Sequence, residues 1–236
     1  MASDPSGQGR QNSLLAALSP EDHALLAPHF KEMALKMGTV LQEPETPIEF
    51  VYFPLEGMVS LFAVMSDGRG IEIATVGKEG VVGAMCGFGI RLGLTRAVVQ
   101  APVVACRISC LHFHAAVQNS EPLRNLMASY NEALLAQVQQ TAACNALHSI
   151  ECRLARWLLQ THDRVESDVL PLTQEFLSQM LGVNRTTVTL VARQLQKAGL
   201  IQNRRGRVIV LDRQGLEEVA CECYALVRNR TRALLP

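Results

Sequence analysis

Residues 173–199 read TQEFLSQMLGVNRTTVTLVARQLQKAG, and this stretch decides the fold of the C-terminal third of the chain. Apolar residues recur at helical spacing on both sides of Gly182, which predicts two short helices. Glycine has no Cβ and readily adopts the left-handed conformation, so Gly182 suits a sharp turn between them. Thr173 and Asn184 stand at the starts of the two helices, where their side chains can cap free backbone N–H groups. The sequence therefore predicts a helix-turn-helix.

A short basic hairpin follows the two helices. Gly199 ends the second helix, and Leu200-Ile201 begins a strand. The segment Arg204-Arg205-Gly206-Arg207 makes a tight turn, and residues 208–211 return as the second strand. Arginines at the tip of a hairpin suit contact with phosphates. A helix-turn-helix followed by a basic wing is typical of a winged helix-turn-helix DNA-binding domain.

The second helix of the motif is predicted to contact the edges of the base pairs. Its exposed N-terminal part begins with Arg185, whose guanidinium can donate two hydrogen bonds to guanine O6 and N7. Threonine hydroxyls can bond to phosphates, and threonine methyls can contact thymine. An ordinary helical hairpin with a solvated arginine is the alternative, and the basic wing that follows argues against it. The candidate DNA-binding residues are Thr173, Asn184, Arg185, Thr186, Thr187, Thr189, Arg193, Arg204, Arg205 and Arg207.

The charge of the chain is unevenly distributed, although its net charge is zero. From residue 173 to the end there are ten Lys and Arg against five Asp and Glu. The rest of the chain has 12 basic and 17 acidic residues. Because affinity for DNA depends on Lys and Arg that neutralise phosphates, we expect only the C-terminal part to meet double-stranded DNA.

Residues 40–109 show a different pattern, in which short runs of β-forming residues alternate with turn signals. Many short strands at a spacing of roughly ten residues indicate an antiparallel barrel or roll. Asp67-Gly68 between two of the runs is a good hairpin signal. Short helices are expected before the roll, over residues 13–37. The expected strands are residues 50–53, 58–64, 71–76, 97–99 and 103–108.

A long helix is expected from about Glu121 to Ser149, with no Gly or Pro after Pro122. Apolar residues recur along it at spacings of three and four, which makes a continuous stripe. The stripe can form part of the core of its own chain or a coiled coil between two subunits. We favour the coiled coil, because a small roll offers little surface along so long a helix. The expected dimer-interface residues are Leu123, Met127, Tyr130, Leu134, Val138 and Thr141.

These patterns predict an α+β protein with an antiparallel β-roll, a long dimerisation helix and a C-terminal winged helix-turn-helix. Residues 1–13 are expected to be a disordered tail, because Gly, Pro and Ser cannot build a packed core. The expected units are residues 14–120 for the sensor roll, 121–150 for the dimerisation helix and 151–236 for the DNA-binding domain.

The sequence resembles the catabolite-activator/fumarate-nitrate regulator (Crp/Fnr) superfamily. LSQMLGVNRTTVTLVARQLQKAGLI, residues 177–201, is similar to its recognition motif, and VYFPLEGMVSLFAVMSDGRGIEIATVGKEGVVGAM, residues 51–85, is similar to its effector roll. The resemblance covers about residues 14–212. It implies a homodimer that binds a palindromic site as a transcription regulator and contacts RNA polymerase or blocks it. In the family's motif a glutamate that reads cytosine usually follows the arginine, and here Thr186 stands there, so the operator is expected to differ.

The expected effector pocket departs from the family's cyclic-nucleotide sites. The family's Gly-Glu, whose carboxylate holds the ribose, corresponds to Gly83 and Ala84, and the cassette arginine is displaced to Arg96. A missing buried carboxylate weakens ribose binding, so cyclic AMP is not expected as the effector, and the signal is unknown. Residues 1–85 hold no cysteine, so the N-terminal iron–sulphur cluster of other members is not expected either. The effector-pocket candidates are Glu72, Gly83, Ala84, Thr95 and Arg96.

Cys144, His148 and Cys152 are spaced four residues apart, so on a helix they would share one face. Thiolate and imidazole can bind soft metals, but cysteine is more often a small buried hydrophobe, so no metal is expected here. Cys221 and Cys223 are too close in the chain to hold zinc without partners elsewhere.

No catalytic motif is present, and no run of 18 apolar residues suggests a membrane span, so a cytoplasmic non-enzyme is expected. The alternative function is a ligand- or redox-sensing roll that acts through protein contacts, with a degenerate DNA-binding domain.

Overall fold

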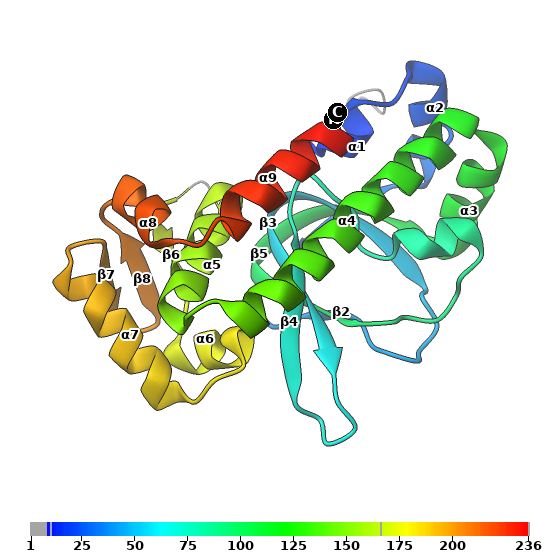
Figure 1. Cartoon of the computed structure of the whole chain (residues 1–236). Helices are drawn as coiled ribbons and strands as arrows, with labels where there is room; N and C mark the ends of the chain where they lie inside the picture. The colour runs from blue at the N-terminus through cyan, green and yellow to red at the C-terminus, as the bar shows by residue number, and fades with distance from the viewer. Residues whose placement is uncertain (1–8, 10, 166, 236) are drawn as a thin grey trace.

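A computed structural model describes residues 9, 11–165 and 167–235 of the 236-residue chain (Figure 1). The chain begins with α1 (Ser13–Ala16), α2 (Pro20–Ala24) and the 3₁₀ helix η1 (Ala27–His29). The expectation of helices through residue 37 is wrong, because Lys31–Leu35 forms strand β1. Pairing of this segment with a long strand of the roll overrides the helix propensity of its Lys, Glu, Met, Ala and Leu residues.

The expectation of a disordered tail through residue 13 also fails at its last residues. Residues 1–8 and 10 lie outside the described part of the chain. Asn12 is fully buried and caps α1, accepting from the backbone N–H groups of Leu14 and Leu15. Its side-chain amide donates to the carbonyls of Pro54 (2.9 Å) and Gly80 (2.8 Å). One polar residue with four good partners therefore holds this end of the chain on the roll.

An antiparallel sheet forms the roll, with strand order β1-β5-β3-β4. Its strands are β3 (Phe50–Val64), β4 (Gly70–Val76) and β5 (Arg96–Ser109), and the short β2 (Val40–Gln42) also pairs with β5. Strands β3 and β5 each join two of the runs expected from the sequence. The register of β3 against β5 shifts on both sides of Gly57. Gly57 has φ +78°, and a Cβ there would collide with the backbone of Pro102, so only glycine lets the strands approach.

Helices cover the roll. The 3₁₀ helix η2 (Ala84–Phe88) and α3 (Cys110–Asn119) follow β4 and β5, and α4 (Glu121–Leu147) then crosses the molecule diagonally (Figure 1). Phe113 of α3 is fully buried between Phe53 and the glycine of η2, so only His112 and His114 of the His-Phe-His segment approach the surface.

The apolar stripe of α4 faces its own chain, which corrects the expectation that it faces a second subunit. Leu123, Met127 and Tyr130 are at most 4% exposed and lie in the same core as the buried residues of the roll. Thr141 is buried as well, and Leu134 and Val138 are half-buried against the cores of the roll. The physical reason is that α4 lies directly on the roll and is flanked by a C-terminal helix that the sequence reading did not foresee.

The C-terminal part begins with α5 (Ile150–Val165), β6 (Val169–Leu170), α6 (Gln174–Leu181) and α7 (Arg185–Lys197). The hairpin β7 (Ile201–Arg204) and β8 (Arg207–Val210) joins β6 in a small sheet of order β6-β8-β7. Trp157 is 1% exposed at the centre of this core. Its ring and the ring of Phe176 of α6 are arranged edge to face, with their centroids 6.4 Å apart.

Two helices end the chain, α8 (Arg213–Val219) and α9 (Cys223–Leu234). Helix α9 runs back along α4, and its end lies near α1 (Figure 1). Leu235 packs against the N-terminal core that contains Leu14 and Leu15. The C-terminal helix therefore spans the molecule and links the DNA-binding part to the roll.

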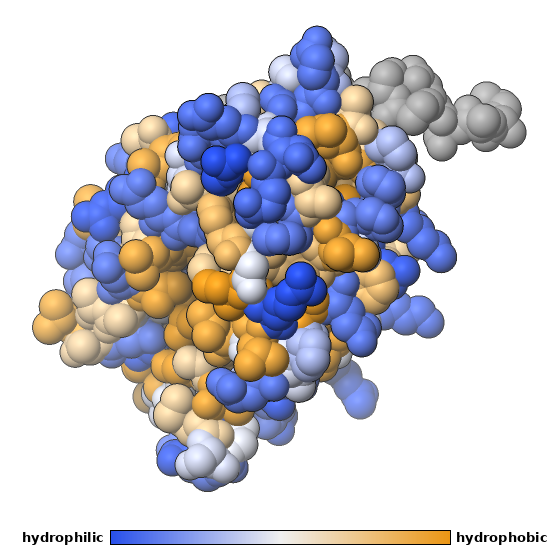
Figure 2. Space-filling model, turned by 90° about the vertical axis from the view of Figure 1, so that its right-hand side faces the viewer, coloured by the Kyte–Doolittle hydropathy of each residue, from blue (hydrophilic) through white to orange (hydrophobic). Residues whose placement is uncertain are grey.

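Apolar side chains gather near the middle of the face that lies on the right of Figure 1 (Figure 2). Large apolar residues of the roll that stay more than one-third exposed include Phe88, Ile90, Leu92 and Leu94. Within the described residues, no helix is both long and apolar enough to span a membrane.

Candidate nucleic-acid interface

Helices α6 and α7 are joined by the turn that the sequence predicts. Gly182 ends α6 in the left-handed conformation, with φ +64°. Thr173 caps α6, and its hydroxyl accepts from the backbone N–H of Phe176 (3.2 Å). Asn184 stands at the N-cap of α7, but its side chain makes no capping bond. The Asn184 amide is exposed and remains available to a ligand such as a phosphate.

One concave surface collects most of the candidate base-reading residues. It is lined by Gln174, Arg185, Thr186, Thr187, Thr189, Leu190 and Arg193 and has a volume of about 540 Å³. The Arg185 side chain is 68% exposed, and its nearest acidic neighbour is Glu175 at 3.9 Å. A weak ion pair of this kind leaves the guanidinium free to exchange its partner for a base or a phosphate.

Two residues of this surface were missed by the sequence reading. Gln174 accepts a hydrogen bond from Thr189 Oγ1 (2.7 Å), so Thr189 is held in place by the preceding helix. Leu190 is 60% exposed on α7, although it is a large apolar residue. Glutamine can bond to adenine, and an exposed leucine suits the thymine methyl. An exposed leucine between buried Val188 and Val191 is a signal that helical phasing of the sequence could have provided.

The wing carries the remaining basic candidates. Arg204, Arg205 and Arg207 are exposed around the β7–β8 turn. The wing is fixed to the reading helix by Asn203, whose backbone N–H donates to Gln196 Oε1 (2.8 Å) and whose amide donates to the Ala192 carbonyl (3.2 Å). Two hydrogen bonds thus hold the wing against helix α7.

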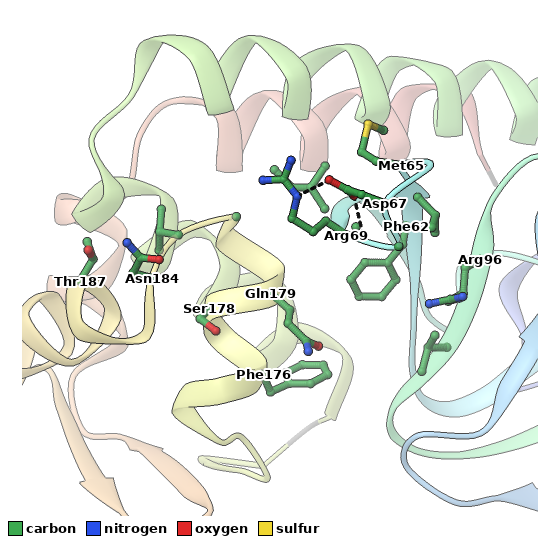
Figure 3. Close-up of a pocket in the computed structure, with 17 residues that line it drawn as sticks. Phe62, Met65, Asp67, Arg69, Arg96, Phe176, Ser178, Gln179, Asn184 and Thr187 are labelled. Atoms are coloured by element: carbon green, nitrogen blue, oxygen red, sulfur yellow. Dashed lines mark hydrogen bonds and ion pairs between the residues drawn. The ribbon is translucent and has the colours of Figure 1, made fainter.

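A cleft of about 1160 Å³ separates the helix-turn-helix from the roll (Figure 3). Phe176, Ser178 and Gln179 of α6 form one wall, and the β3–β4 hairpin with Asp67 and Arg69 forms part of the other. Its further lining residues include Phe62, Met65, Arg96, Asn184 and Thr187. Two of the candidate DNA-contacting residues therefore also line the boundary with the roll.

Besides the apolar core that the roll and the DNA-binding part share, three contacts between them stand out. Trp157 Nε1 donates to Glu72 Oε1 (2.7 Å). Arg164 forms an ion pair with Glu79 (2.6 Å) in which both side chains are less than one-third exposed. The third contact is close packing at the turn between the reading helices, where a Cβ on Gly182 would lie 2.8 Å from Ile71 Cδ1.

The effector-pocket candidates do not share contacts. Glu72 is buried between Ser60 and Trp157, and burial raises the pKa of its carboxyl to about 7. Gly83 and buried Ala84 lie near Ile48 and Phe50, in a different core. The Thr95 carbonyl accepts from Gln42, and Arg96 forms an ion pair with Glu43 (2.8 Å). Of these five candidates, Arg96 is the one that lines the cleft of Figure 3.

Buried side chains of the roll form a core of their own. Its buried residues include Tyr52, Val59, Leu61, Val76 and Val99. Gln137 of α4 reaches into the sheet and bonds to Thr75. The cradle expected for a ribose and a phosphate holds no carboxylate at Ala84, and the arginine of the cassette is engaged elsewhere.

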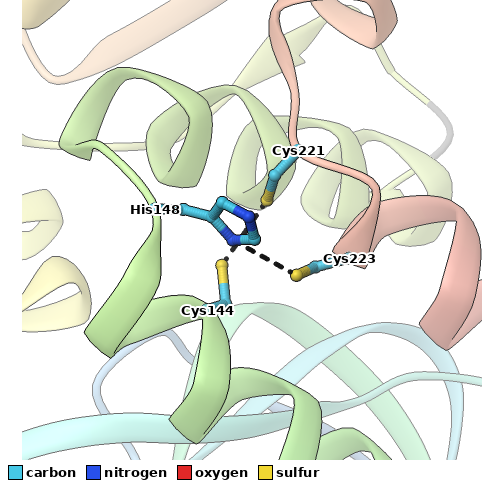
Figure 4. Close-up of side chains that lie close together, drawn as sticks. All are labelled: Cys144, His148, Cys221 and Cys223. Carbon is cyan, nitrogen blue, oxygen red and sulfur yellow. Dashed lines mark hydrogen bonds between the residues drawn. The ribbon is translucent and has the colours of Figure 1, made fainter.

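The metal candidates are only partly brought together. Cys144 and His148 meet Cys221 and Cys223 from the far end of the chain (Figure 4). Cys152 lies beside this cluster, and its sulfur accepts from the Ser149 hydroxyl (3.2 Å). Cys221 and Cys223 lacked partner ligands in the sequence analysis, and in the fold they lie beside Cys144 and His148.

Comparison with known proteins agrees with this geometry. Residues 32–120 match the model of the cyclic nucleotide-binding domain, and residues 152–219 match that of the Crp-like helix-turn-helix domain. The chain is 27% identical over 197 residues to the transcriptional regulator SdrP of Thermus thermophilus, a match that covers 80% of this chain and 93% of that protein.

Solved structures show the same fold. A CRP/FNR-family transcriptional regulator of Thermus thermophilus superposes with a TM-score of 0.67 at 25% identity, covering 80% of this chain and 98% of its own. FixK2 of Bradyrhizobium japonicum gives a TM-score of 0.68 at 16% identity, covering 81% and 98%. The chain is a transcription regulator with a sensor roll and a DNA-binding helix-turn-helix. Its two domains and its fold are those of Crp/Fnr-type regulators.

Proposed function

We propose that the protein is a homodimeric, sequence-specific regulator that binds a palindromic operator. The observation that carries this proposal is the single exposed surface on which Arg185, Thr186 and Arg193 lie together, beside a rigid wing with three arginines. A helix of this kind enters the major groove with its N-terminal residues on base edges, while the wing contacts the backbone. Gln174 and Leu190 extend the reading surface.

We propose that the dimer forms through the outer face of α4, since the inner face is buried in its own chain. Ala128, Leu135 and Ala142 are exposed and recur every seven residues, and Leu135 is 56% exposed. Glu132, Gln139 and Ala146 complete an alternating spacing of four and three. This is the heptad spacing of a two-stranded coiled coil, and its alanines would let two helices approach closely.

The signal is proposed to act at the junction between the roll and the DNA-binding part rather than through cyclic AMP. Ala84 and the Glu43–Arg96 ion pair argue against the ribose and phosphate contacts of the family. The Glu72–Trp157 bond and the Ile71–Gly182 contact would transmit a change in the roll to the reading helix. By the family resemblance, the protein acts on RNA polymerase in the cytoplasm as a regulator and not as an enzyme.

The test is a selection of bound duplexes from a random DNA pool. We expect enrichment of an inverted repeat whose half-sites are separated by about one helical turn or a multiple of it. The double variant Arg185→Ala/Arg193→Ala should lose the enrichment, whereas Lys36→Ala on the roll, outside the proposed interface, should keep it. Failure of the wild-type protein to enrich any sequence would favour the alternative, in which the roll acts through protein contacts.

A further inference from the structure

The strongest unassigned feature of the molecule is a cluster of three cysteines and one histidine. Cys144 lies in the last turn of α4, and His148 caps that helix. Cys221 and Cys223 lie 77 and 79 positions after Cys144, between α8 and the start of α9. All four ligand atoms lie within 4.8 Å of one another. Figure 4 shows the two pairs converging from opposite sides, so the fold, and not local spacing, creates the cluster.

Two of the distances in the cluster match the edges of a small tetrahedron. Cys144 Sγ lies 3.5 Å from Cys221 Sγ, and Cys223 Sγ lies 3.5 Å from His148 Nδ1. A zinc ion with thiolates at about 2.3 Å and an imidazole nitrogen at about 2.0 Å has edges of roughly 3.5–3.8 Å. A cluster of several irons binds its cysteines through different iron atoms, which requires a wider ligand set. The cluster therefore has the size for one ion.

The second ring nitrogen of His148 has the partner that a metal-bound histidine needs. His148 Nε2 lies 3.3 Å from Glu222 Oε1, between the two cysteines of the far segment. A carboxylate on the second nitrogen fixes the tautomer and leaves Nδ1 free to bind a metal. Nδ1 is the atom that faces Cys223.

The surroundings also suit a cluster of thiolates. Arg153 and Arg156 of α5 are each only 5% exposed. Their Nε atoms have no hydrogen-bond partner, and within the described residues neither forms an ion pair with an acidic side chain within 4 Å. Three thiolates with one divalent ion carry a net charge of −1, which would offset part of this buried positive charge.

We propose that Cys144, His148, Cys221 and Cys223 form a binding site for one soft divalent metal ion of the zinc class. Three of the four side chains are buried, and the His148 side chain is 24% exposed, so ions would enter along the imidazole. The ion would join the end of α4 to the start of α9, where the DNA-binding part meets the C-terminal helix. This site is independent of the proposed operator binding.

The first experiment measures metal in the full-length protein. Protein purified without a metal-binding tag and kept reduced should take up one Zn²⁺ per chain in competition with a chromophoric chelator. Co²⁺ in place of Zn²⁺ should give a thiolate-to-cobalt charge-transfer band and the intense visible bands of a tetrahedral site. Hydrogen exchange in residues 221–234 should slow when the ion binds, because the start of α9 becomes fixed.

Matched variants identify the ligands. Cys144→Ser and Cys223→Ser should each abolish stoichiometric uptake and the cobalt–thiolate band. Cys152→Ser, which changes the neighbouring cysteine, and Cys106→Ser in the roll should keep both. Glu222→Gln should keep the spectrum but weaken the affinity roughly ten- to hundredfold, because it acts through His148.

Two results would overturn the site. One is a reduced wild-type protein that shows no cobalt–thiolate band and does not compete with the chelator. The other is full metal uptake by Cys144→Ser.

Discussion

Trp157 Nε1 donates a 2.7 Å hydrogen bond to Glu72 Oε1, and this bond joins the core of the DNA-binding part to strand β4 of the roll. Glu72 is 6% exposed, and its other carboxylate oxygen accepts from the Ser60 hydroxyl. Ser60 in turn bonds to buried Gln100 (3.3 Å). A titratable group thus lies at the boundary where a signal in the roll would have to pass.

We expect the stability of the protein to fall as the pH rises from about 4.5 to about 7. Burial raises the pKa of Glu72 to about 7 from its ordinary value of 4.5. The folded state therefore holds a proton in this interval that the unfolded state has released, so unfolding becomes easier as the pH rises. Across this pH interval Glu72 should lower the free energy of unfolding by roughly 3 kcal/mol, at 1.36 kcal/mol for each pKa unit.

Glu72→Gln should remove this dependence. A glutamine can accept from Trp157 and donate to Ser60 without a buried charge, so the variant should exceed the wild type in stability at pH 8 and resemble it near pH 4.5. Urea unfolding at both pH values measures this, with Glu56→Gln, an exposed residue of β3, as the control. A wild-type protein equally stable at pH 5 and pH 8 would contradict the assignment.

Gly57→Ala should be much more destabilising than Gly68→Ala. Both glycines have positive φ, at +78° and +84°, so an alanine costs about 1–2 kcal/mol at either position from its backbone conformation alone. At Gly68 a new Cβ meets nothing within 4 Å, whereas at Gly57 it collides with the Pro102 backbone. Equal losses in the free energy of unfolding for the two variants would show that β3 and β5 can separate at little cost.

Leu135→Glu should convert the proposed dimer to monomers and weaken operator binding roughly a hundredfold or more, since both half-sites are no longer bound together. Light scattering and binding to operator DNA measure the two effects. Leu111→Glu is the control, because Leu111 is 64% exposed on α3 and lies outside the proposed interface. A Leu135→Glu protein that remains dimeric would place the interface on another face.

Predictions from the sequence were most accurate where the structure depends on interactions between residues close together in the chain. Gly182, the Thr173 cap and the arginines of the wing each act on backbone only a few residues away, and the turn, the cap and the hairpin are as expected. Strands β3 and β5 were expected in pieces, because the turn signals Pro54-Leu55-Glu56-Gly57 and Ala101-Pro102 are bulges or bends within continuous strands.

Contacts between distant segments could not be predicted from the sequence. The stripe on α4 was assigned to a second subunit because nothing in the sequence shows that the roll and α9 would cover it. The same helix α9 brings Cys221 and Cys223 to Cys144, which depends on how the 76 residues between Cys144 and Cys221 fold. An apolar stripe shows that a helix face is buried but does not identify what buries it.

The last prediction separates base reading from phosphate anchoring. Arg185 begins α7 on the concave reading surface, whereas Arg205 lies at the tip of the wing. Arg185→Ala should cost about 1–3 kcal/mol on the operator and much less on random DNA, because a bidentate contact to guanine discriminates between bases. Arg205→Ala should weaken binding to both duplexes about equally, because it removes one phosphate contact. It should also reduce the slope of log affinity against log salt concentration by roughly one.

The measurement is binding of operator and random duplexes across a series of salt concentrations. Lys36→Ala on the roll serves as the control for a general change in charge. If Arg185→Ala lowers both affinities equally, Arg185 is a phosphate anchor, because a residue that contacts only the backbone cannot distinguish the two duplexes. Sequence reading would then depend on Thr186, Leu190 and Arg193, which share the same exposed surface of α7.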